Sequence, residues 1–284
     1  MMKRIRTALC LILAAALLAG CAFLPSESEP EALAPADPLT GHPLEWPGQR
    51  PVAVTIENST ASATQWGISS ASVVLEALTE AGMATELCLV YPALAATPKV
   101  GPVAAGQDIY WRLLVGQQPL PVQRGGGQFD QNYLDYYSIR AVDALEAGRT
   151  AFDCGSEWSN APLWYTSGSA VSKVLDALSI SAVLTESRVT SAASAAAASA
   201  SSGSDAVLTV PALLPQEEDG KLPDATAPDA VNVRVCFDDN NATGFAYDPD
   251  SGLYRMLHAD GTPQLDANNG QQAGFDNLLV LFSA

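Results

Sequence analysis

Two carboxylates, Glu76 and Glu80, stand four positions apart in a segment whose apolar residues recur at helical spacing. The spacing predicts a helix over residues 71–82 with both carboxylates on one face. Paired carboxylates cleave glycosides when they approach the bond from opposite sides of a cleft. Two glutamates on one helix face are more simply a solvated surface, because helix faces are normally charged. We retain both as candidate ligand-binding residues and assign neither a catalytic role.

Arg124, Gly125 and Gly126 suggest a different chemistry, since a cation beside glycine amides can hold an anion. A run of glycines equally suits a tight loop that binds nothing. The run lacks the spacing of a phosphate-binding loop, so it does not predict a nucleotide site. Asn58, which follows a predicted strand over residues 52–56, is a further candidate for ligand binding.

Histidine-dependent and metal-dependent chemistry have little support. The sequence contains two histidines, and His42 falls in a segment predicted to lack a fold, so a catalytic triad would depend on His258 alone. A solvated turn is the plainer interpretation of His258. Histidine and cysteine ligands at useful spacing for zinc are missing, and the calcium-like run 248–252 has its glycine one position early, which favours a hairpin turn. We therefore expect no catalytic residues, no metal and no cofactor.

Three cysteines follow the N-terminal region: Cys88, Cys154 and Cys236. An odd number allows at most one disulfide among them. Cys88 and Cys236 lie in apolar, strand-like runs, which predicts that both fill the core. Cys154 is predicted to lie in a loop and to be the more exposed thiol.

The first 21 residues form a secretory signal. Lys3, Arg4 and Arg6 precede an uncharged apolar stretch, residues 7–19, that is too short to span a bilayer as a mature helix. The stretch ends in Leu-Ala-Gly-Cys, which resembles a bacterial lipobox, whose cysteine is diacylated (palmitate is the typical chain) and becomes the new N-terminus. The alternative is an ordinary signal peptide that ends beside a cysteine. We expect Cys21 to anchor the protein at the extracytoplasmic face of the cell membrane.

The charge of the chain excludes nucleic acid as a partner. The formal charge is −17, and removal of residues 1–20 takes away three cations and brings it to −20. Nucleic-acid binding needs clustered lysine and arginine, which this composition does not provide. Solubility and weak non-specific association are the simplest consequences of the charge.

Composition and periodicity divide the chain into five predicted parts. Proline-rich and acidic segments cannot bury enough apolar area to order themselves, and an almost pure Ala/Ser run at residues 191–204 reads as a flexible linker, with a solvated helix as the alternative. The parts are a signal peptide (1–20), an acidic, proline-rich stalk (21–49), an α/β domain (50–186), a low-complexity linker (187–229) and a β-rich C-terminal domain (230–284).

The first predicted domain reads as a sheet covered by helices. Strands over residues 52–56 and 85–91 flank the predicted helix at 71–82, and strand, helix, strand with short joins is a βαβ-like pattern. Further helices are predicted over residues 109–114, 133–140, 142–147 and 169–184.

The last predicted domain contains strands alone. Residues 231–237 alternate as a half-buried strand, residues 244–257 form a hairpin, and residues 277–282 form a final strand. So few strands make a poor independent sheet, so they either extend the first sheet or form an incomplete domain. The predicted fold class is therefore α/β or α+β, with a small antiparallel C-terminal lobe that looks incomplete.

Several short motifs in a fixed order resemble the YerB-like family of bacterial lipoproteins, which carry an N-terminal and a C-terminal domain of unknown function. The resemblance runs from residue 38 onward, outside the Ala/Ser run, and rests on the order of its motifs more than on any single one. They are Pro38–Gly41, Arg50–Val54 with Asn58, Gly67–Ser69, Glu76–Gly82, Lys99–Val103, Gly125–Gly127, Asn160–Pro162, Phe245–Asp248, Gly252–Arg255 and Asn277–Val280.

The chain departs from that family pattern at positions that would carry charge. The resemblance implies arginine where this sequence has Glu86, Ala104 and Gln107, and histidine near Gln123 and at Leu163. If those cations line a shared anion site, this member has lost that site or changed its ligand. The family's C-terminal domain also extends beyond the position of Ala284, which predicts a shortened member.

Three functions follow from these observations. The first is a lipid-anchored surface protein that binds a small ligand or an envelope partner without catalysis, through Asn58, Glu76, Glu80, Arg124, Gly125 and Gly126. The second is a carboxylate-based hydrolase of the cell envelope. The third is a degenerate family member without a ligand site. The scarcity of histidine favours the first and the third over an enzyme.

Overall fold

A computed structural model describes residues 35–58, 64–79, 82, 84–155, 163–184, 210–214 and 229–281. Within it, Ala36–Ala284 cluster as one compact unit. The predicted signal peptide, Cys21, Glu80 and the Ala/Ser run at 191–204 lie outside the described residues.

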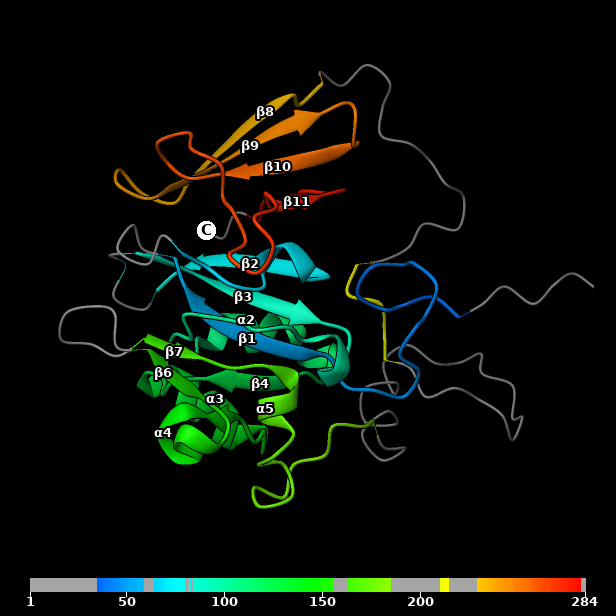
Figure 1. Ribbon diagram of the computed structural model, residues 1–284, viewed down its shortest axis with the longest axis vertical. Coiled ribbons are helices and arrows are strands. Elements are labelled where there is room, and N and C mark those ends of the chain that lie inside the picture. Colours follow the sequence, from blue (N-terminus) through cyan, green and yellow to red (C-terminus); the bar gives the residue numbers. More distant parts are fainter. Residues whose placement is uncertain are drawn as a thin grey trace, which may run out of the picture. The chain divides into compact units, whose positions relative to one another are not determined.

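A mixed five-stranded sheet forms the centre of the N-terminal part (Figure 1). Strand β1 pairs antiparallel with β3 and parallel with β4; β3 also pairs antiparallel with β2, and β4 pairs parallel with β5. The spatial order is β2-β3-β1-β4-β5. The strands are β1 (Val52–Glu57), β2 (Val73–Leu78), β3 (Thr85–Tyr91), β4 (Leu120–Gln123) and β5 (Val142–Asp143). The predicted mixed α/β class is confirmed.

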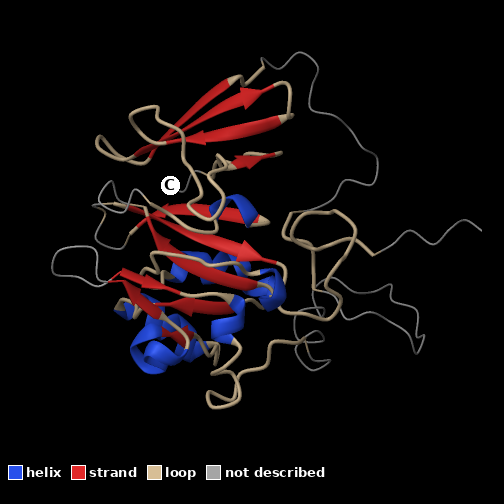
Figure 2. Ribbon diagram, in the orientation of Figure 1, coloured by secondary structure: helices blue, strands red, loops and turns tan. Residues whose placement is uncertain are grey.

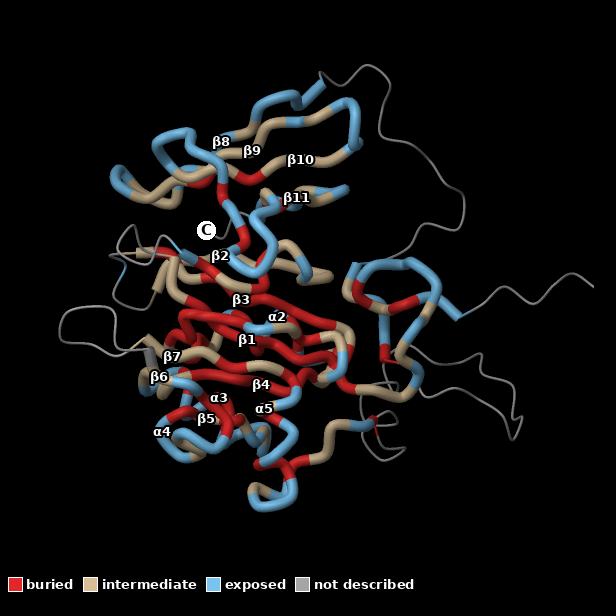
Figure 3. The backbone as a smooth tube through the Cα atoms, viewed as in Figure 1, coloured by how far each residue is buried: buried red, intermediate tan, exposed pale blue. Residues whose placement is uncertain are grey.

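The central strand is buried on both faces, as its continuous apolar sequence predicts. Val52, Val54 and Ile56 pack into one hydrophobic cluster, while Ala53 packs into a second cluster on the opposite face. Figure 3 shows the resulting buried band along β1 and β3. The core therefore lies on both sides of the sheet, and the polar ends of its strands are left at the sheet's edge.

Short helices accompany this sheet (Figure 2). Tyr110, Trp111 and Leu114 of α2 are buried in the second cluster, beside Ala53 of β1. The α-helices are α2 (Asp108–Leu114), α3 (Gln128–Tyr136), α4 (Ala144–Ala147) and α5 (Gly168–Val171), and the 3₁₀ turns are η3 (Ile68–Ser70), η4 (Leu94–Ala96), η5 (Val115–Gln117) and η6 (Gly148–Thr150).

These helices match the predicted ones unevenly. The helix predicted over 109–114 is confirmed as α2, and α3 begins and ends earlier than the predicted 133–140. The segment 142–147 divides into β5 and α4, with Asp143 capping the helix through the Leu145 amide. The long helix predicted over 169–184 is wrong: α5 ends at Val171, and the chain continues in turns.

The helix predicted over 71–82 is wrong, because residues 73–78 form strand β2. Val73, Leu75 and Ala77 pack against one hydrophobic cluster and Val74 against the other, which is the alternation of a strand. The apolar residues satisfy both a period of 3.6 and a period of 2, and antiparallel pairing with β3 decides between them. Strands β2 and β3 are therefore an antiparallel pair, and the described residues between 52 and 91 contain no βαβ unit.

Two cysteine predictions are also corrected. Cys88 is buried on β3, as predicted, but Cys236 is exposed, because it lies on the same face of its strand as Asn232 and Arg234. Cys154 lies on a strand instead of in a loop and is half-buried. It belongs to a two-stranded antiparallel ribbon of β6 (Asp153–Gly155) and β7 (Leu163–Tyr165).

A second, four-stranded antiparallel sheet follows near the C-terminus, in the order β11-β10-β9-β8. The predicted strand at 231–237 and the hairpin at 244–257 are confirmed. The final predicted strand is wrong over its described residues 277–281, which have no strand, and Leu279 and Leu281 are exposed. The strands are β8 (Asn232–Cys236), β9 (Ala242–Asp248), β10 (Leu253–Leu257) and β11 (Gly274–Phe275).

Buried contacts join the C-terminal strands to the first sheet. Met256 and Ala273 belong to the same hydrophobic cluster as Val52 of β1. The fully buried carboxylate of Asp266 accepts hydrogen bonds from the Gly67 amide at 3.0 Å and from the Ser69 hydroxyl at 2.8 Å. The C-terminal strands therefore extend the core of the first sheet.

Part of the predicted stalk also contacts the fold. Leu39 is buried in the second hydrophobic cluster, and Gln49 forms a β-bridge with Val183. Asp37 is buried and accepts a hydrogen bond from the Leu39 amide. Residues 36–49, which were predicted to belong to the stalk, therefore pack as part of the folded unit.

Candidate functional site

A cavity lies where three strands of the first sheet end or begin. It has a volume of about 380 Å³. The carboxyl ends of the parallel strands β1 and β4 lie at one edge of the sheet, and because β3 runs antiparallel to β1, its first residues lie at the same edge. The lining residues are Glu57, Asn58, Thr79, Ala84, Thr85, Glu86, Ala104, Ala105, Arg124 and Leu145.

Two glutamates from neighbouring strands line this cavity. Glu57 ends β1 and is the direct cross-strand partner of Glu86, the second residue of β3. Like charges that lie directly opposite on antiparallel strands destabilise the pair. The Glu86 carboxylate accepts a hydrogen bond of 2.9 Å from the Gln107 side-chain amide, which offsets part of that cost.

The environment of Glu86 changes its acidity. Burial raises the pKa of Glu86 from its ordinary 4.5 to about 7, the hydrogen bond from Gln107 opposes this, and the charge of Glu57 adds to it. Near neutral pH the Glu86 side chain therefore exchanges readily between its neutral and charged forms. A carboxyl group in that state can accept or donate a hydrogen bond to a ligand.

Arg124 supplies a positive charge to the same cavity. It follows β4 directly, is half-buried, and its backbone amide donates to the Ala104 carbonyl at 2.8 Å. Among the residues that the structure describes, no carboxylate forms an ion pair with its guanidinium. The guanidinium can therefore meet an anionic group in the cavity.

The neighbouring glycines do not serve the predicted anion site. The Gly125 amide donates to both carboxylate oxygens of Asp143, at 2.9 and 3.0 Å, so an internal anion already occupies it. Gly126 forms a bridge with Gly106, and a Cβ atom at Gly126 would overlap the Asp130 carboxylate. Neither glycine lines the cavity. Their role is close backbone packing, which corrects the prediction that they contact a ligand.

Asn58 connects the cavity to the half-buried Glu76 behind it. Its side-chain amide donates hydrogen bonds of 2.9 Å to Glu76 Oε1 and to Thr85 Oγ1. Glu76 Oε1 also accepts a hydrogen bond of 2.8 Å from Thr243 of β9, and burial raises the pKa of Glu76. Glu76 does not line the cavity, which corrects the prediction that it contacts a ligand. Its role in the structure is to orient the Asn58 side chain.

The structure thus brings together two of the predicted site residues, Asn58 and Arg124, and adds Glu57 and Glu86, which were not predicted. Cross-strand register makes them neighbours, and register cannot be obtained from either strand alone. The departures from the family pattern carried a partial signal: Glu86 and Ala104 both line the cavity, and Gln107 donates to Glu86.

The other predicted chemistry lies elsewhere. His258 is half-buried, and its backbone is held in a turn by Thr262. Asp248 accepts hydrogen bonds within its hairpin turn from Ser251 and Arg255. Among the described residues, no group of three or more His, Cys, Asp and Glu side chains is arranged to hold a metal ion.

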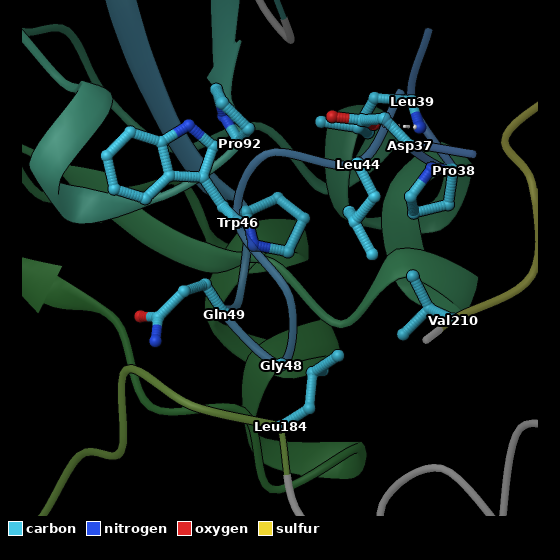
Figure 4. A pocket seen from close by; sticks show the side chains of 11 residues that line it. Asp37, Pro38, Leu39, Leu44, Trp46, Gly48, Gln49, Pro92, Leu184 and Val210 are labelled. Carbon is cyan, nitrogen blue, oxygen red and sulfur yellow. Dashed lines mark hydrogen bonds between the residues drawn. The ribbon is translucent and has the colours of Figure 1, made fainter. Parts of the chain in front are cut away.

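A second hollow is too small for a ligand. It lies beside the segment that contains Leu39, Leu44 and Trp46, and its volume is about 20 Å³ (Figure 4). A space of that size holds about one water molecule. The mixed-charge cavity at the strand ends, defined by Glu57, Glu86 and Arg124, is therefore the candidate ligand site.

Comparison with known proteins gives consistent matches. The profile of the family described as "Protein of unknown function (DUF3048) N-terminal domain" matches residues 39–181. "Putative lipoprotein YerB" of Bacillus subtilis (strain 168) is 25% identical over 249 residues, which cover 86% of this chain and 66% of the relative. The chain therefore spans slightly less than two thirds of that relative's length.

A solved structure has a fold similar to that of this chain. The crystal structure of YerB protein from Bacillus subtilis matches with a TM-score of 0.65 at 22% identity, covering 84% of this chain and 72% of the solved one. No helix among the described residues is both long enough and apolar enough to cross a membrane.

Proposed function

Because the chain belongs to the DUF3048 family of proteins of unknown function, as its matched residues 39–181 show, we propose a function from its own site. In this proposal the protein is a lipid-anchored protein of the bacterial envelope that binds a small polar ligand without catalysis. The ligand occupies the mixed-charge cavity at the strand ends.

One observation carries this proposal: side chains of opposite charge converge on a single cavity of useful size. Glu57, Glu86 and Arg124 line a volume of about 380 Å³. Small-molecule sites typically occupy about 300–1,000 Å³ and place a few polar groups on largely apolar walls. Three alanines and Leu145 supply such walls here.

The lipid anchor in this proposal rests on the N-terminal sequence. Cys21 ends a lipobox-like run after a basic, apolar signal, and the similar protein from Bacillus subtilis carries the name lipoprotein. Intact mass of the membrane fraction tests this point, because a diacylated chain that begins at Cys21 is heavier than the cleaved polypeptide alone. A C21S variant retains the full signal and lacks the added mass.

A second candidate function is favoured by the acidity of Glu86. A carboxyl with a pKa near 7 beside a second carboxylate is the combination that glycosidases use as acid and nucleophile. Glu57 and Glu86 extend from neighbouring strands of one sheet, however, so they lie side by side and do not enclose a bond from opposite sides. Binding therefore fits this arrangement better than hydrolysis.

The test is ligand-induced stabilisation of the full chain, purified in detergent. The probes are amino acids, neutral sugars, polyamines and inorganic phosphate, each at millimolar concentration. We expect at least one class to raise the melting temperature of the parent protein, by mass action on the folded state, and to lose this effect in R124M. The matched control R149M changes an exposed arginine outside the cavity and should respond like the parent.

Two outcomes would contradict the proposal. If no probe class stabilises the parent protein, the cavity is not a ligand site of this kind. If R124M and R149M respond equally, the ligand binds elsewhere. Turnover of envelope glycans that is abolished in E86Q would instead support the hydrolase.

A further inference from the structure

We propose that the ligand of the mixed-charge cavity is a small zwitterion, with an ammonium group held between Glu57 and Glu86 and an acidic group held by Arg124. This inference rests on the proposed function and names the chemical class that the site selects. It follows from the order of the charges along the sheet edge, from their existing partners and from the size of the cavity.

The charges are separated along the sheet edge. Glu86 belongs to β3, Glu57 to β1, and Arg124 follows β4, and these strands are successive neighbours in the sheet. Neighbouring strands lie about 4.8 Å apart. The acidic side and the basic side of the cavity are thus about one or two strand spacings apart, roughly 5–10 Å. Amino acids and dipeptides carry their two charges over comparable or shorter distances, with hydrogen-bond lengths making up the remainder.

The acidic side suits an ammonium group. The register places Glu57 and Glu86 directly opposite each other, and among the described residues the Glu86 carboxylate accepts a hydrogen bond from Gln107 alone. An ammonium group has three donors and one positive charge, so it can donate to both carboxylates and remove their repulsion. A neutral sugar hydroxyl offers one donor and no charge.

The basic side suits an acidic group. A guanidinium presents planar paired donors that match the two oxygens of a carboxylate. Asp143, on the neighbouring strand β5, is already engaged by the Gly125 and Leu145 amides. No described carboxylate forms an ion pair with Arg124, so that position is open to a ligand's acid.

The remaining walls limit the size of the ligand. Ala84, Ala104 and Ala105 contribute small apolar surfaces, while Thr79 and Thr85 add hydroxyl groups. A cavity of about 380 Å³ accommodates an amino acid or a dipeptide, whereas a long peptide is too large to fit inside it. Among the described lining residues, none is aromatic, so these residues offer no platform on which a sugar ring can stack.

The experiment compares three forms of one probe by calorimetry with the full chain. The probe is the dipeptide alanylalanine, and the blocked forms are N-acetyl-alanylalanine and alanylalanine amide. We expect the unblocked dipeptide to bind at least ~10-fold more tightly than either blocked form, since each block removes one charge pair and ~10-fold corresponds to about 1.4 kcal/mol. In R124M, alanylalanine amide and alanylalanine should bind with equal affinity. In E86Q, the affinities of N-acetyl-alanylalanine and alanylalanine should become more similar than in the parent protein.

The outcomes separate this inference from the proposed function. Equal binding of the blocked and unblocked dipeptides overturns the zwitterion. So does stabilisation by neutral sugars, polyamines or phosphate when amino acids and dipeptides have no effect, although the cavity then remains a ligand site. If no probe class stabilises the parent protein, both proposals fail. The exposed-residue variants R149M and E45Q serve as charge-matched controls.

Discussion

Thr243 Oγ1 on β9 donates a hydrogen bond of 2.8 Å to Glu76 Oε1 on β2, and that same oxygen accepts a hydrogen bond of 2.9 Å from Asn58. One carboxylate oxygen therefore joins the C-terminal sheet to a residue of the candidate site. The contact is part-buried, so its loss removes one of the two hydrogen bonds to this oxygen where water replaces it only in part.

Replacing this donor tests its contribution. We expect T243V, which keeps the shape and removes the hydroxyl, to lower the free energy of unfolding by about 1.5–3 kcal/mol, the range for hydrogen bonds to charged groups. Urea denaturation measures the change. T262V removes an exposed hydroxyl that donates to Asp260 and should change stability by less than about 0.5 kcal/mol. Equal effects of the two substitutions would show that the Thr243 hydrogen bond contributes no more to the free energy of unfolding than an exposed one does.

Stability should fall as pH rises through the titration of Glu86. Its folded pKa is raised from 4.5 to about 7, so the folded protein holds this proton more tightly than the unfolded chain does. The stabilising contribution is complete below about pH 4.5 and is lost as pH rises to about 7, with a total of up to about 3 kcal/mol. We expect E86Q to be less sensitive to pH over this window and more stable than the parent at pH 8.

Denaturant unfolding of both proteins at pH 5 and pH 8 measures this effect. The quantity of interest is the difference between the parent and E86Q, because other titrating groups, Glu76 among them, contribute to both proteins. E45Q changes an exposed carboxylate and provides the control. If the parent and E86Q lose the same stability between the two pH values, burial does not perturb Glu86 in the way described.

Cysteine reactivity should follow burial and not sequence context. Cys88 is fully buried, and burial raises the pKa of its thiol well above the ordinary range, whereas Cys236 is exposed on β8. We expect a thiol reagent to modify Cys236 in the folded protein and Cys88 only in denaturant. Peptide mass mapping after timed labelling measures both sites. Prompt labelling of Cys88 under native conditions would contradict its buried position.

A methyl group at Gly126 should destabilise the fold. A Cβ atom there would overlap the carboxylate of Asp130, which is itself fixed by a hydrogen bond from the Trp111 indole. We expect G126A to cost about 1–3 kcal/mol, as overpacking does. Gly116 has open space around its Cβ position, so G116A should be close to neutral. Thermal melts of the two variants give the comparison, and a neutral G126A would show that Asp130 moves aside easily.

Much of the fold could be predicted from local sequence. The continuous apolar run of β1 and the turn residues between β9 and β10 each specify one structure, and both are confirmed. Residues 71–82 do not, because their apolar positions fit a strand and a helix equally well, and only pairing with β3 decides. The prediction for Cys236 was wrong for a related reason. The alternation of the strand was predicted correctly, but Cys236 shares the exposed face with Asn232 and Arg234.

The site was less predictable than the fold. Asn58 could be identified because it follows a predicted strand, and Arg124 because it is a cation beside a run of glycines. Glu57 and Glu86 could not be paired from sequence, since their proximity depends on the register between strands separated along the chain. The glycines were misjudged because the sequence does not show that Asp143 occupies the Gly125 amide.

The three alanines in the cavity wall have a consequence for how this site diverges. Ala84, Ala104 and Ala105 hold space open, and none of them contributes a charge to the strand ends. Substitution of one of these alanines by a larger residue would change which molecules fit the cavity, while the sheet and its charged residues stay in place. Ligand selectivity and folding therefore depend on different residues in this protein, so substitutions can change the bound ligand while the fold is kept.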